Sequence, residues 1–203
     1  MNPRTRLALA AKELIPLRQG DLDGLCGLYA IINAVRLAIH PGQRLRHPQS
    51  KRLFEAGIVT LGRHRRLRYA LHEGMTDATW RRVCEAVLAE ADRLVAGSVT
   101  ATWIFAGEAR LEVRDMVRRV RRSIREGNPV LITLGGCYHH WTVVVGFNGD
   151  RLRLFDSASY RWVLIRSIGS ATDHPLRRHQ ISPAGVIALS FRSLTGTVAA
   201  RET

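Results

Sequence analysis

The sequence has 203 residues and a mass of 22.7 kDa, which is the size of one ordinary domain. Hydrophobic residues make up 46% of it, so global disorder and low-complexity architectures are excluded. The formal net charge is +14, and nearly all of the positive charge is arginine because only Lys12 and Lys51 are lysines. Such a charge favours nucleic acid, an anionic surface or an acidic protein as partner, and it says nothing about the fold.

No segment of the sequence predicts a membrane span. The longest apolar run, at 25–35, is far shorter than the roughly 20 residues that a bilayer requires. The apolar stretch at 7–11 is too short for the apolar region of a secretory signal. The cysteines are three in number, lie far apart and form no CxxC pair, which argues against a disulfide framework. We therefore expect a cytoplasmic protein with reduced thiols.

The first half of the chain predicts helices. The segment 24–38 is apolar on nearly every face, which is typical of a helix that is buried all round. A second helix is expected from about 50 through 58, followed by a basic loop at 63–68. The clearest amphipathic pattern follows Thr76 and Asp77, where apolar residues repeat at helical spacing up to Val95 and Gly97 follows as a C-cap. A strand at 98–105 and a helix at 111–125 complete this half.

From Pro129 onward the pattern changes to strands. Extended apolar segments are expected at 130–134, 140–147, 151–156, 162–165 and 185–191. The dipeptide at 148–149, Asn-Gly, is typical of a tight hairpin turn. Long alternation of strands and helices is absent here, so we expect a mostly antiparallel sheet and the α+β class. We expect a single domain over 1–203, with a helical lobe at about 14–126, a sheet lobe at about 127–193 and a flexible tail at about 194–203.

Three residues from different parts of the chain fit nucleophilic catalysis. Cys26 begins the buried helix, where the positive end of the helix dipole favours a thiolate. His140 opens a predicted strand, from which an imidazole can accept and return a proton. Asp156 ends the next strand. If the two strands pair about residue 148, His140 and Asp156 are directly opposite each other and within reach of a hydrogen bond.

A fourth residue completes the set that acyl transfer through a thioester requires. Gln19 lies in a polar loop before Cys26, where its side-chain amide can point at an oxyanion. The four residues supply a nucleophile, a base, an orienting acid and an oxyanion donor. His139 competes with His140 as the base, because a shift of one residue in register exchanges the two faces of a strand. The hairpin geometry favours His140.

These residues, in this order, resemble a known family. Gln19, then Cys26-Gly27 opening an apolar helix, then Gly-Asn-Pro-Val at 127–130, then His140 within His-Trp-Thr-Val-Val-Val-Gly, then Asp156, look like the papain-like cysteine peptidases. Within that superfamily the chain is most similar to the bacterial double-glycine-leader peptidases and their stand-alone relatives, over about residues 18–158.

The resemblance implies a papain-like fold, in which a central buried helix with the cysteine packs against a mostly antiparallel sheet with the histidine and the aspartate, and the cleft lies between them. It implies Cys26 as nucleophile, His140 as general base and acid, Asp156 as the orienting residue and Gln19 as the oxyanion-hole donor. Leader peptidases typically have Asp before the cysteine and Pro after the final Asp, whereas this chain has Leu25 and Ser157. A double-glycine leader is therefore not the expected substrate.

The sequence thus predicts a cysteine-dependent hydrolase, a peptidase that acts on a peptide or protein through a thioester. A deamidase or a transglutaminase-like acyl transferase of the same fold is the alternative among enzymes. A basic nucleic-acid-binding protein is the alternative of another class, with the arginines of 63–68 and 114–125 as contacts, although no nucleic-acid-binding motif is present.

The expected partner is a peptide or protein substrate, and the net charge favours an acidic one. No cofactor is expected. Cys137, His139 and His140 are close in sequence, but they lack a complementary pair of ligands at the spacing typical of a metal site. The sequence leaves the oligomeric state open.

Overall fold

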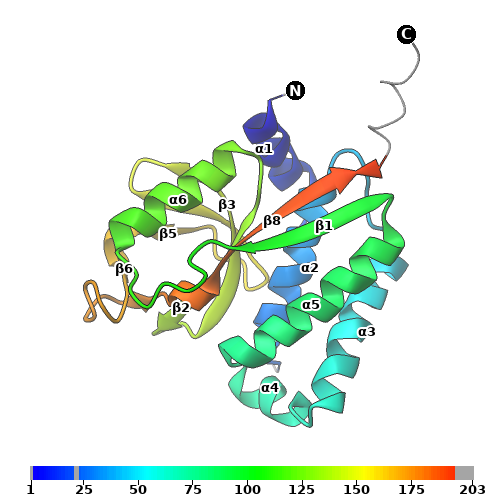
Figure 1. The fold of residues 1–203 in the computed structure, drawn as a ribbon, viewed down its shortest axis with the longest axis horizontal. Coiled ribbons are helices and arrows are strands. Elements are labelled where there is room, and N and C mark those ends of the chain that lie inside the picture. The colour runs from blue at the N-terminus through cyan, green and yellow to red at the C-terminus, as the bar shows by residue number, and fades with distance from the viewer. Residues whose placement is uncertain (1, 21–22, 195–203) are drawn as a thin grey trace.

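The computed structural model describes residues 2–20 and 23–194, and Figure 1 shows its ribbon. Its helices are α1 (Pro3–Glu13), α2 (Cys26–Ile39), α3 (His47–Arg63), α4 (Leu67–Glu73), α5 (Asp77–Leu94) and α6 (Val113–Arg125). Its strands are β1 (Gly97–Trp103), β2 (Val130–Gly136), β3 (His140–Asn148), β4 (Arg151–Phe155), β5 (Trp162–Leu164), β6 (Ile168–Gly169), β7 (His179–Gln180) and β8 (Val186–Ser193). None of the described helices is long and apolar enough to cross a membrane. The tail expected at 194–203 lies outside the described residues except for its first residue.

The strands form a sheet in the order β1-β8-β2-β3-β4-β5, and each neighbouring pair on that path is antiparallel. The short β7 pairs antiparallel with the end of β2 and parallel with β6. The expected α+β class with a mostly antiparallel sheet is confirmed. The division into two lobes at residue 127 stays a prediction, and β1 and α6, which precede that residue, pack with the strands of the sheet.

Four elements, α1, α4, β6 and β7, were not predicted, because their sequences lack a clear hydrophobic periodicity. Asn2 caps α1, since its side chain accepts a hydrogen bond from the Arg4 backbone at 2.9 Å, and Pro3 opens the helix. α4 has only seven residues and begins inside the segment 63–68, which we expected to be a loop. β6 and β7 have two residues each, too few for an alternating pattern.

The helix α2 lies at the centre of the molecule (Figure 1), in contact with α3, α5 and the sheet. All but two of its residues are buried, as the apolar segment at 24–38 predicted. The first six residues of β3 are also buried without alternation, so both faces of the sheet are covered at this strand. Both α2 and α6 pack against β3. The start of α2 and the start of β3 are therefore fixed within one core.

Trp80 of α5 connects these two starts. Its ring stacks on that of Trp141, with centroids 4.2 Å apart and planes within 2°, and its Nε1 donates to the Gly27 carbonyl at 3.2 Å. A Cβ atom at position 27 would lie 2.5 Å from the indole, so only glycine permits this approach. Gly27 follows Cys26 and Trp141 follows His140 in the chain, and the indole therefore sets the spacing between the helix start and the strand start.

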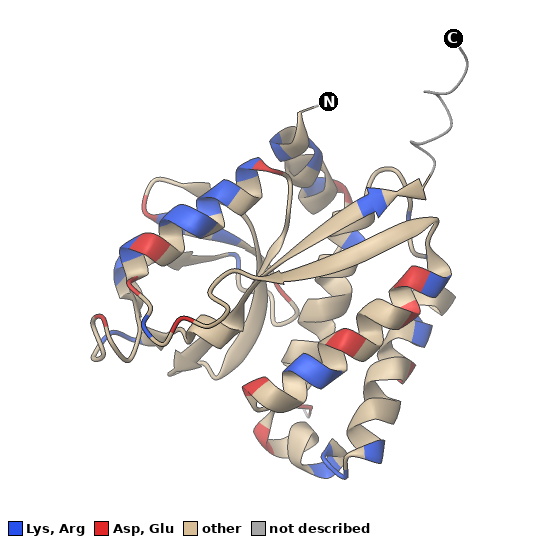
Figure 2. Ribbon diagram, viewed as in Figure 1, with Lys and Arg blue, Asp and Glu red and all other residues tan. Residues whose placement is uncertain are grey.

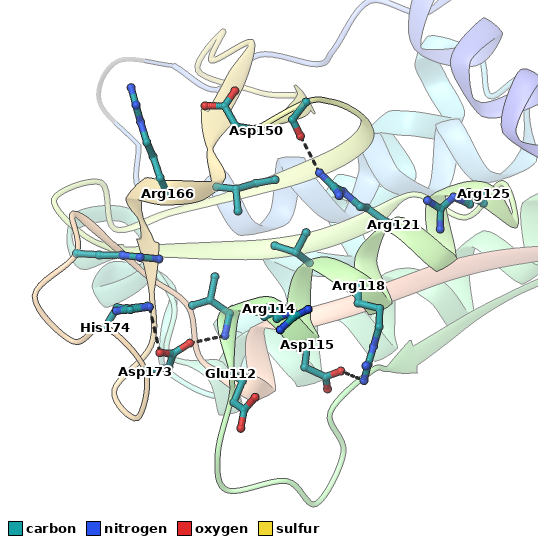
Figure 3. Close-up of a pocket in the computed structure, with 15 residues that line it drawn as sticks. Glu112, Arg114, Asp115, Arg118, Arg121, Arg125, Asp150, Arg166, Asp173 and His174 are labelled. Atoms are coloured by element: carbon teal, nitrogen blue, oxygen red, sulfur yellow. Dashed lines mark hydrogen bonds and ion pairs between the residues drawn. The ribbon is translucent and has the colours of Figure 1, made fainter.

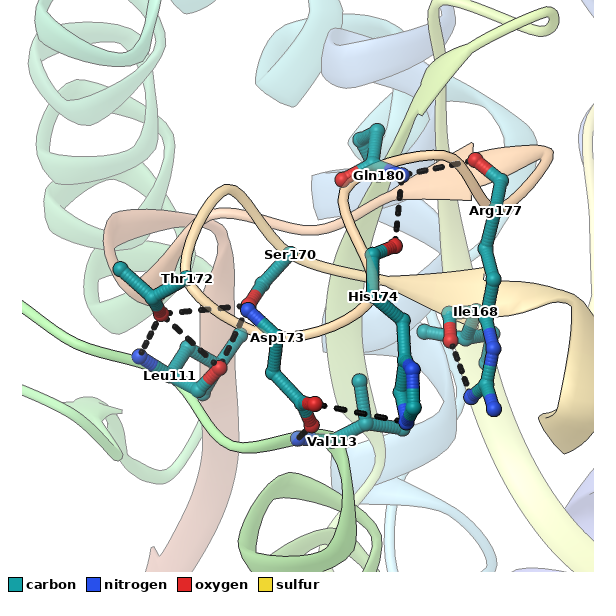
Figure 4. A network of polar contacts seen from close by, with 9 residues as sticks. All are labelled: Leu111, Val113, Ile168, Ser170, Thr172, Asp173, His174, Arg177 and Gln180. Carbon is teal, nitrogen blue, oxygen red and sulfur yellow. Dashed lines mark hydrogen bonds and ion pairs between the residues drawn. The ribbon is translucent and has the colours of Figure 1, made fainter.

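The segment between β5 and β8 is tied to the start of α6 by polar side chains (Figure 4). Asp173 accepts a hydrogen bond from the Val113 backbone at 2.8 Å, and Thr172 accepts one from the Leu111 backbone at 3.1 Å. The Ser170 hydroxyl donates to the Leu111 carbonyl. These contacts hold the chain that leads into β7, and so place β7 beside the end of β2.

We expect Trp80→Ala to lower the free energy of unfolding by about 3–5 kcal/mol, because it removes a buried ring and leaves a cavity between α2 and β3. Trp162→Ala is the control, since that side chain is 47% exposed and its loss should cost far less. Urea unfolding followed by circular dichroism measures both. Equal losses in the two variants would contradict the role given to Trp80.

Candidate active site

Cys26 is the first residue of α2 and is buried at 6% exposure. The helix has Leu25 as its N-cap residue, without a side-chain hydrogen bond to the first turn, so no cap side chain occupies the backbone donors there. Asp23 instead stabilises the approach, since its carboxylate accepts hydrogen bonds from the backbones of Leu25 at 3.0 Å and Gly20 at 2.8 Å. Sequence reasoning missed Asp23, which a search for capping residues before the helix could have found.

Gly24, two residues before Cys26, packs closely against α4. The Gly24 backbone donates to the Leu71 carbonyl at 2.7 Å, and a Cβ atom at position 24 would lie 2.7 Å from the Ala70 carbonyl oxygen. Glycine is therefore required for this close approach. The chain enters α2 along one path, and that path determines where the Cys26 thiol lies.

His140 and Asp156 form a buried pair at the mouth of the β3–β4 hairpin. The His140 Nε2 atom lies 2.6 Å from Asp156 Oδ2, and the two residues are 5% and 3% exposed. The other carboxylate oxygen, Oδ1, accepts backbone hydrogen bonds from Ala158 at 2.8 Å and from Tyr160 at 3.1 Å. The carboxylate is thus fixed on both oxygens, and it orients the imidazole ring.

The predicted register of this hairpin was wrong. Asn148 pairs with Arg151, so the turn lies between them and is not centred on residue 148. The register then shifts by one residue at a β-bulge between Val144 and Gly146. Extending the pairing beyond the end of β4 places Asp156 across from Thr142, on the same face as His140, so the two side chains meet along a diagonal. Without the bulge, Asp156 would lie on the opposite face.

The electrostatic surroundings of His140 include both Asp156 and Cys26. Burial alone would lower the pKa of His140, but its hydrogen bonds to Asp156 and Cys26 and the charges of both raise the pKa to about 9. Burial likewise favours a raised pKa for Asp156, but the hydrogen bond and charge of His140 prevail and lower it. Near neutral pH the site therefore favours an imidazolium bound to a carboxylate.

The structure places the competing histidine elsewhere. His139 has a positive φ of 45° and is exposed, whereas His140 lies edge-on to the Tyr160 ring with centroids 5.4 Å apart. Tyr160 also holds Asp156 through its backbone, and its ring stacks on Tyr138 at 4.7 Å. Sequence reasoning missed both tyrosines, because nothing in their local pattern indicates this contact.

Gln19 is held beside the residue that follows Asp156. Its backbone donates to the Ser157 carbonyl at 3.3 Å, and its Oε1 accepts a hydrogen bond from the Ser157 hydroxyl at 3.2 Å. Ser157 was a departure from the leader-peptidase pattern, and a proline there would lack this hydroxyl donor. With Oε1 occupied by Ser157, the amide nitrogen of Gln19 remains to donate to another group.

All three cysteines are free. Cys84 is fully buried in α5, and burial raises its pKa to about 12, so it is an unreactive core thiol. Cys137 is exposed in the turn between β2 and β3. Across residues 2–20 and 23–194, no group of three His, Cys, Asp or Glu side chains is placed to hold a metal ion.

The basic face of α6 lines a groove of about 1040 Å³ at the other end of the β3–β4 hairpin (Figure 3). Arg121 reaches across it to donate to the Gly149 carbonyl at 2.7 Å. Figure 2 shows the basic residues repeating along α6. The lining includes both arginines and acidic residues, namely Arg114, Arg118, Arg121, Arg125, Arg166, Arg177, Glu112, Asp115, Asp150 and Asp173. This groove is separate from the His140–Asp156 pair.

No protein-family model matches the sequence, and no curated protein sequence matches it. A similar solved structure is described as the crystal structure of a double glycine motif protease from an AMS/PCAT transporter in complex with the leader peptide. The similarity covers 89% of this chain and 92% of that chain, with 14% sequence identity and a TM-score of 0.44. The likeness is distant.

The pair predicts a pH dependence of stability. A histidine in the unfolded chain has a pKa near 6.5, and the pKa of His140 in the folded protein is about 9. Because the folded value is the higher one, the stabilisation is complete below pH 6.5 and is lost as the pH rises through about 9. Urea unfolding at a series of pH values should show the free energy of unfolding falling over this interval.

Asp156→Asn should remove most of this fall, because the main partner that raises the pKa of His140 is lost while the burial that lowers it remains. His139→Gln is the control and should leave the fall unchanged, since His139 is exposed. The ring-proton resonances of His140 report its titration directly. A pKa of His140 that is the same with and without the Asp156 carboxylate would contradict the assignment.

Proposed function

We propose that this chain is a cysteine peptidase that cleaves a peptide or protein substrate through a thioester on Cys26. The observation that carries the proposal is the buried His140–Asp156 pair, which lies 2.6 Å apart and whose strand start is held against the helix start at Cys26 by the Trp80 stack. A thiolate is the nucleophilic form of cysteine, and a helix N-terminus with an adjacent imidazolium stabilises it. Cys26 and His140 meet these two conditions.

The reaction would use the two ring nitrogens of His140 differently. Asp156 binds Nε2, which leaves Nδ1 for the thiol. The Cys26 sulfur attacks the substrate carbonyl, and the His140 imidazolium then gives its proton to the leaving amine. Water attacks the thioester with His140 as the base, which releases the acid and restores the thiol. Asp156 stays ionised and stabilises the imidazolium throughout.

The oxyanion of the tetrahedral intermediate needs donors fixed in advance. The Gln19 amide nitrogen is one candidate, supported by the hydrogen bond that commits its oxygen to Ser157. The backbone N–H groups at the start of α2 are the other, because Leu25 offers no side-chain cap. Ser157 is thus proposed as a positioning residue for Gln19.

An acidic substrate is the chemistry that best fits the surface. The net charge is +14, and the groove along α6 carries exposed guanidinium groups such as those of Arg114 and Arg125. Arginine binds carboxylates in a planar, bidentate geometry. The lining also includes the half-buried apolar side chain of Ile165, and its six arginines outnumber its four carboxylates.

The test is digestion of a proteome-derived peptide library, followed by mass spectrometry. We expect new peptide termini from the wild-type chain, with acidic peptides enriched among those cleaved, and none from Cys26→Ala. Gln19→Ala should lower kcat by about 10² to 10³ if it donates to the oxyanion. Cys84→Ala is the matched control, because that thiol is fully buried in α5 and should be dispensable for cleavage.

Other products would overturn the proposal in distinct ways. The small mass gain of an amide converted to an acid, without new termini, would identify a deamidase. A new amide cross-link would identify an acyl transferase. Cleavage that persists in Cys26→Ala would remove Cys26 from the mechanism.

A further inference from the structure

Cys137, unlike Cys26 and Cys84, is exposed, and basic side chains contact its sulfur. Cys137 lies in the turn between β2 and β3, three residues before His140. The strand β7 runs beside this turn, where Gly136 pairs with His179 and the Cys137 backbone donates to the Arg178 carbonyl at 3.3 Å. The contacts in Figure 4, including the hydrogen bond from Gln180 to the Arg177 carbonyl at 2.7 Å, help to hold β7 in this position.

Two side chains from β7 and the residue before it contact the sulfur. The Arg178 Nε atom donates to Cys137 Sγ at 3.2 Å, and the His179 Nδ1 atom lies 3.7 Å from the same sulfur. His179 is buried at 4% exposure, whereas Cys137 is open to solvent. A guanidinium stays charged at any physiological pH and stabilises a thiolate. The sulfur therefore contacts both a cation and an imidazole.

The His179 imidazole is neutral and lies within reach of the thiol, so it can act as a general base. Burial lowers the pKa of His179, and the charge of Arg178 lowers it further, so the ring is neutral near pH 7. A neutral imidazole has one nitrogen that accepts a hydrogen bond. The arrangement of nucleophile, base and charge is the one that activates a cysteine.

We propose that Cys137 is a site of reversible modification, at which a low-molecular-weight disulfide such as glutathione disulfide forms a mixed disulfide with the protein. Cys137 gives its proton to His179, and the sulfur attacks one sulfur of the reagent. A new disulfide bond forms, the bond within the reagent breaks, and its electron pair leaves with the released thiolate. The products are the mixed disulfide on Cys137 and the released thiol, whose thiolate takes the proton back from His179, and dithiothreitol reverses the exchange.

The surroundings of Cys137 also accommodate an adduct. Tyr138 stacks on Tyr160 at 4.7 Å and contacts the His179 ring at 4.5 Å, so the wall beside the sulfur is aromatic and well supported. The Arg178 side chain is exposed next to the thiol, where its charge attracts the carboxylates of glutathione. The proposal stands on these contacts and does not depend on catalysis by Cys26.

The experiment uses the full-length Cys26→Ala variant, so that the proposed nucleophile cannot react. Incubation with glutathione disulfide and peptide mass mapping should locate one glutathionyl group on Cys137 and none on the buried Cys84, and dithiothreitol should remove it. Arg178→Met in the same background should slow the modification of Cys137 by about tenfold or more, because the thiolate loses its cation. Arg178→Lys should retain most of the rate.

Arg161→Met is the matched control, since Arg161 is an exposed arginine that is not among the side chains bonded to the Cys137 sulfur. Its rate should equal that of the parent, and circular dichroism checks that each variant is folded. His179→Asn is expected to slow the reaction as well, because the base is lost. Absence of an adduct on Cys137, or a rate that neither Arg178→Met nor His179→Asn changes, would overturn the proposal. Neither result bears on peptide cleavage by Cys26.

Discussion

The stack of Trp80 on Trp141 is the contact on which the geometry of the site depends. The indole lies between the first turn of α2 and the first residues of β3, and it fills that space because Gly27 has no side chain. A helix start and a strand start from distant parts of the chain are thereby held at one fixed spacing. The residues next to these contacts are Cys26 and His140, so the position of the thiol relative to the imidazole follows from core packing.

Within that frame, electrostatics determines the charge state of the site. Burial disfavours a charged histidine and a charged aspartate, and each group alone would be driven toward its neutral form. Their mutual contact at 2.6 Å, together with the backbone donors to Asp156, outweighs that cost and gives an imidazolium beside a carboxylate. An imidazolium beside a cysteine is the arrangement that favours a thiolate. Core packing thus sets the positions of Cys26 and His140, and the ion pair with Asp156 keeps His140 charged.

The sequence predicted the parts of the molecule that depend on local pattern. The apolar segment that became α2, the amphipathic α5 and the strands on either side of residue 148 follow from periodicity and turn chemistry. The register of β3 against β4 could not be predicted, because the bulge near Val145 depends on packing on both faces of the sheet. The roles of Ser157 and Trp80 also could not be predicted from the sequence, since each depends on contacts between segments far apart in the chain.

The central claim, that Cys26 is a thiol activated by His140, is tested most directly by the rate at which iodoacetamide alkylates each cysteine of the folded protein. Site-resolved mass spectrometry gives the rate for Cys26 and for Cys84, which serves as an internal reference because burial raises its pKa to about 12. The account predicts that Cys26 reacts far faster than Cys84, and that His140→Ala slows Cys26 by about tenfold or more. Equal rates for Cys26 and Cys84, or a Cys26 rate that His140→Ala leaves unchanged, would contradict it.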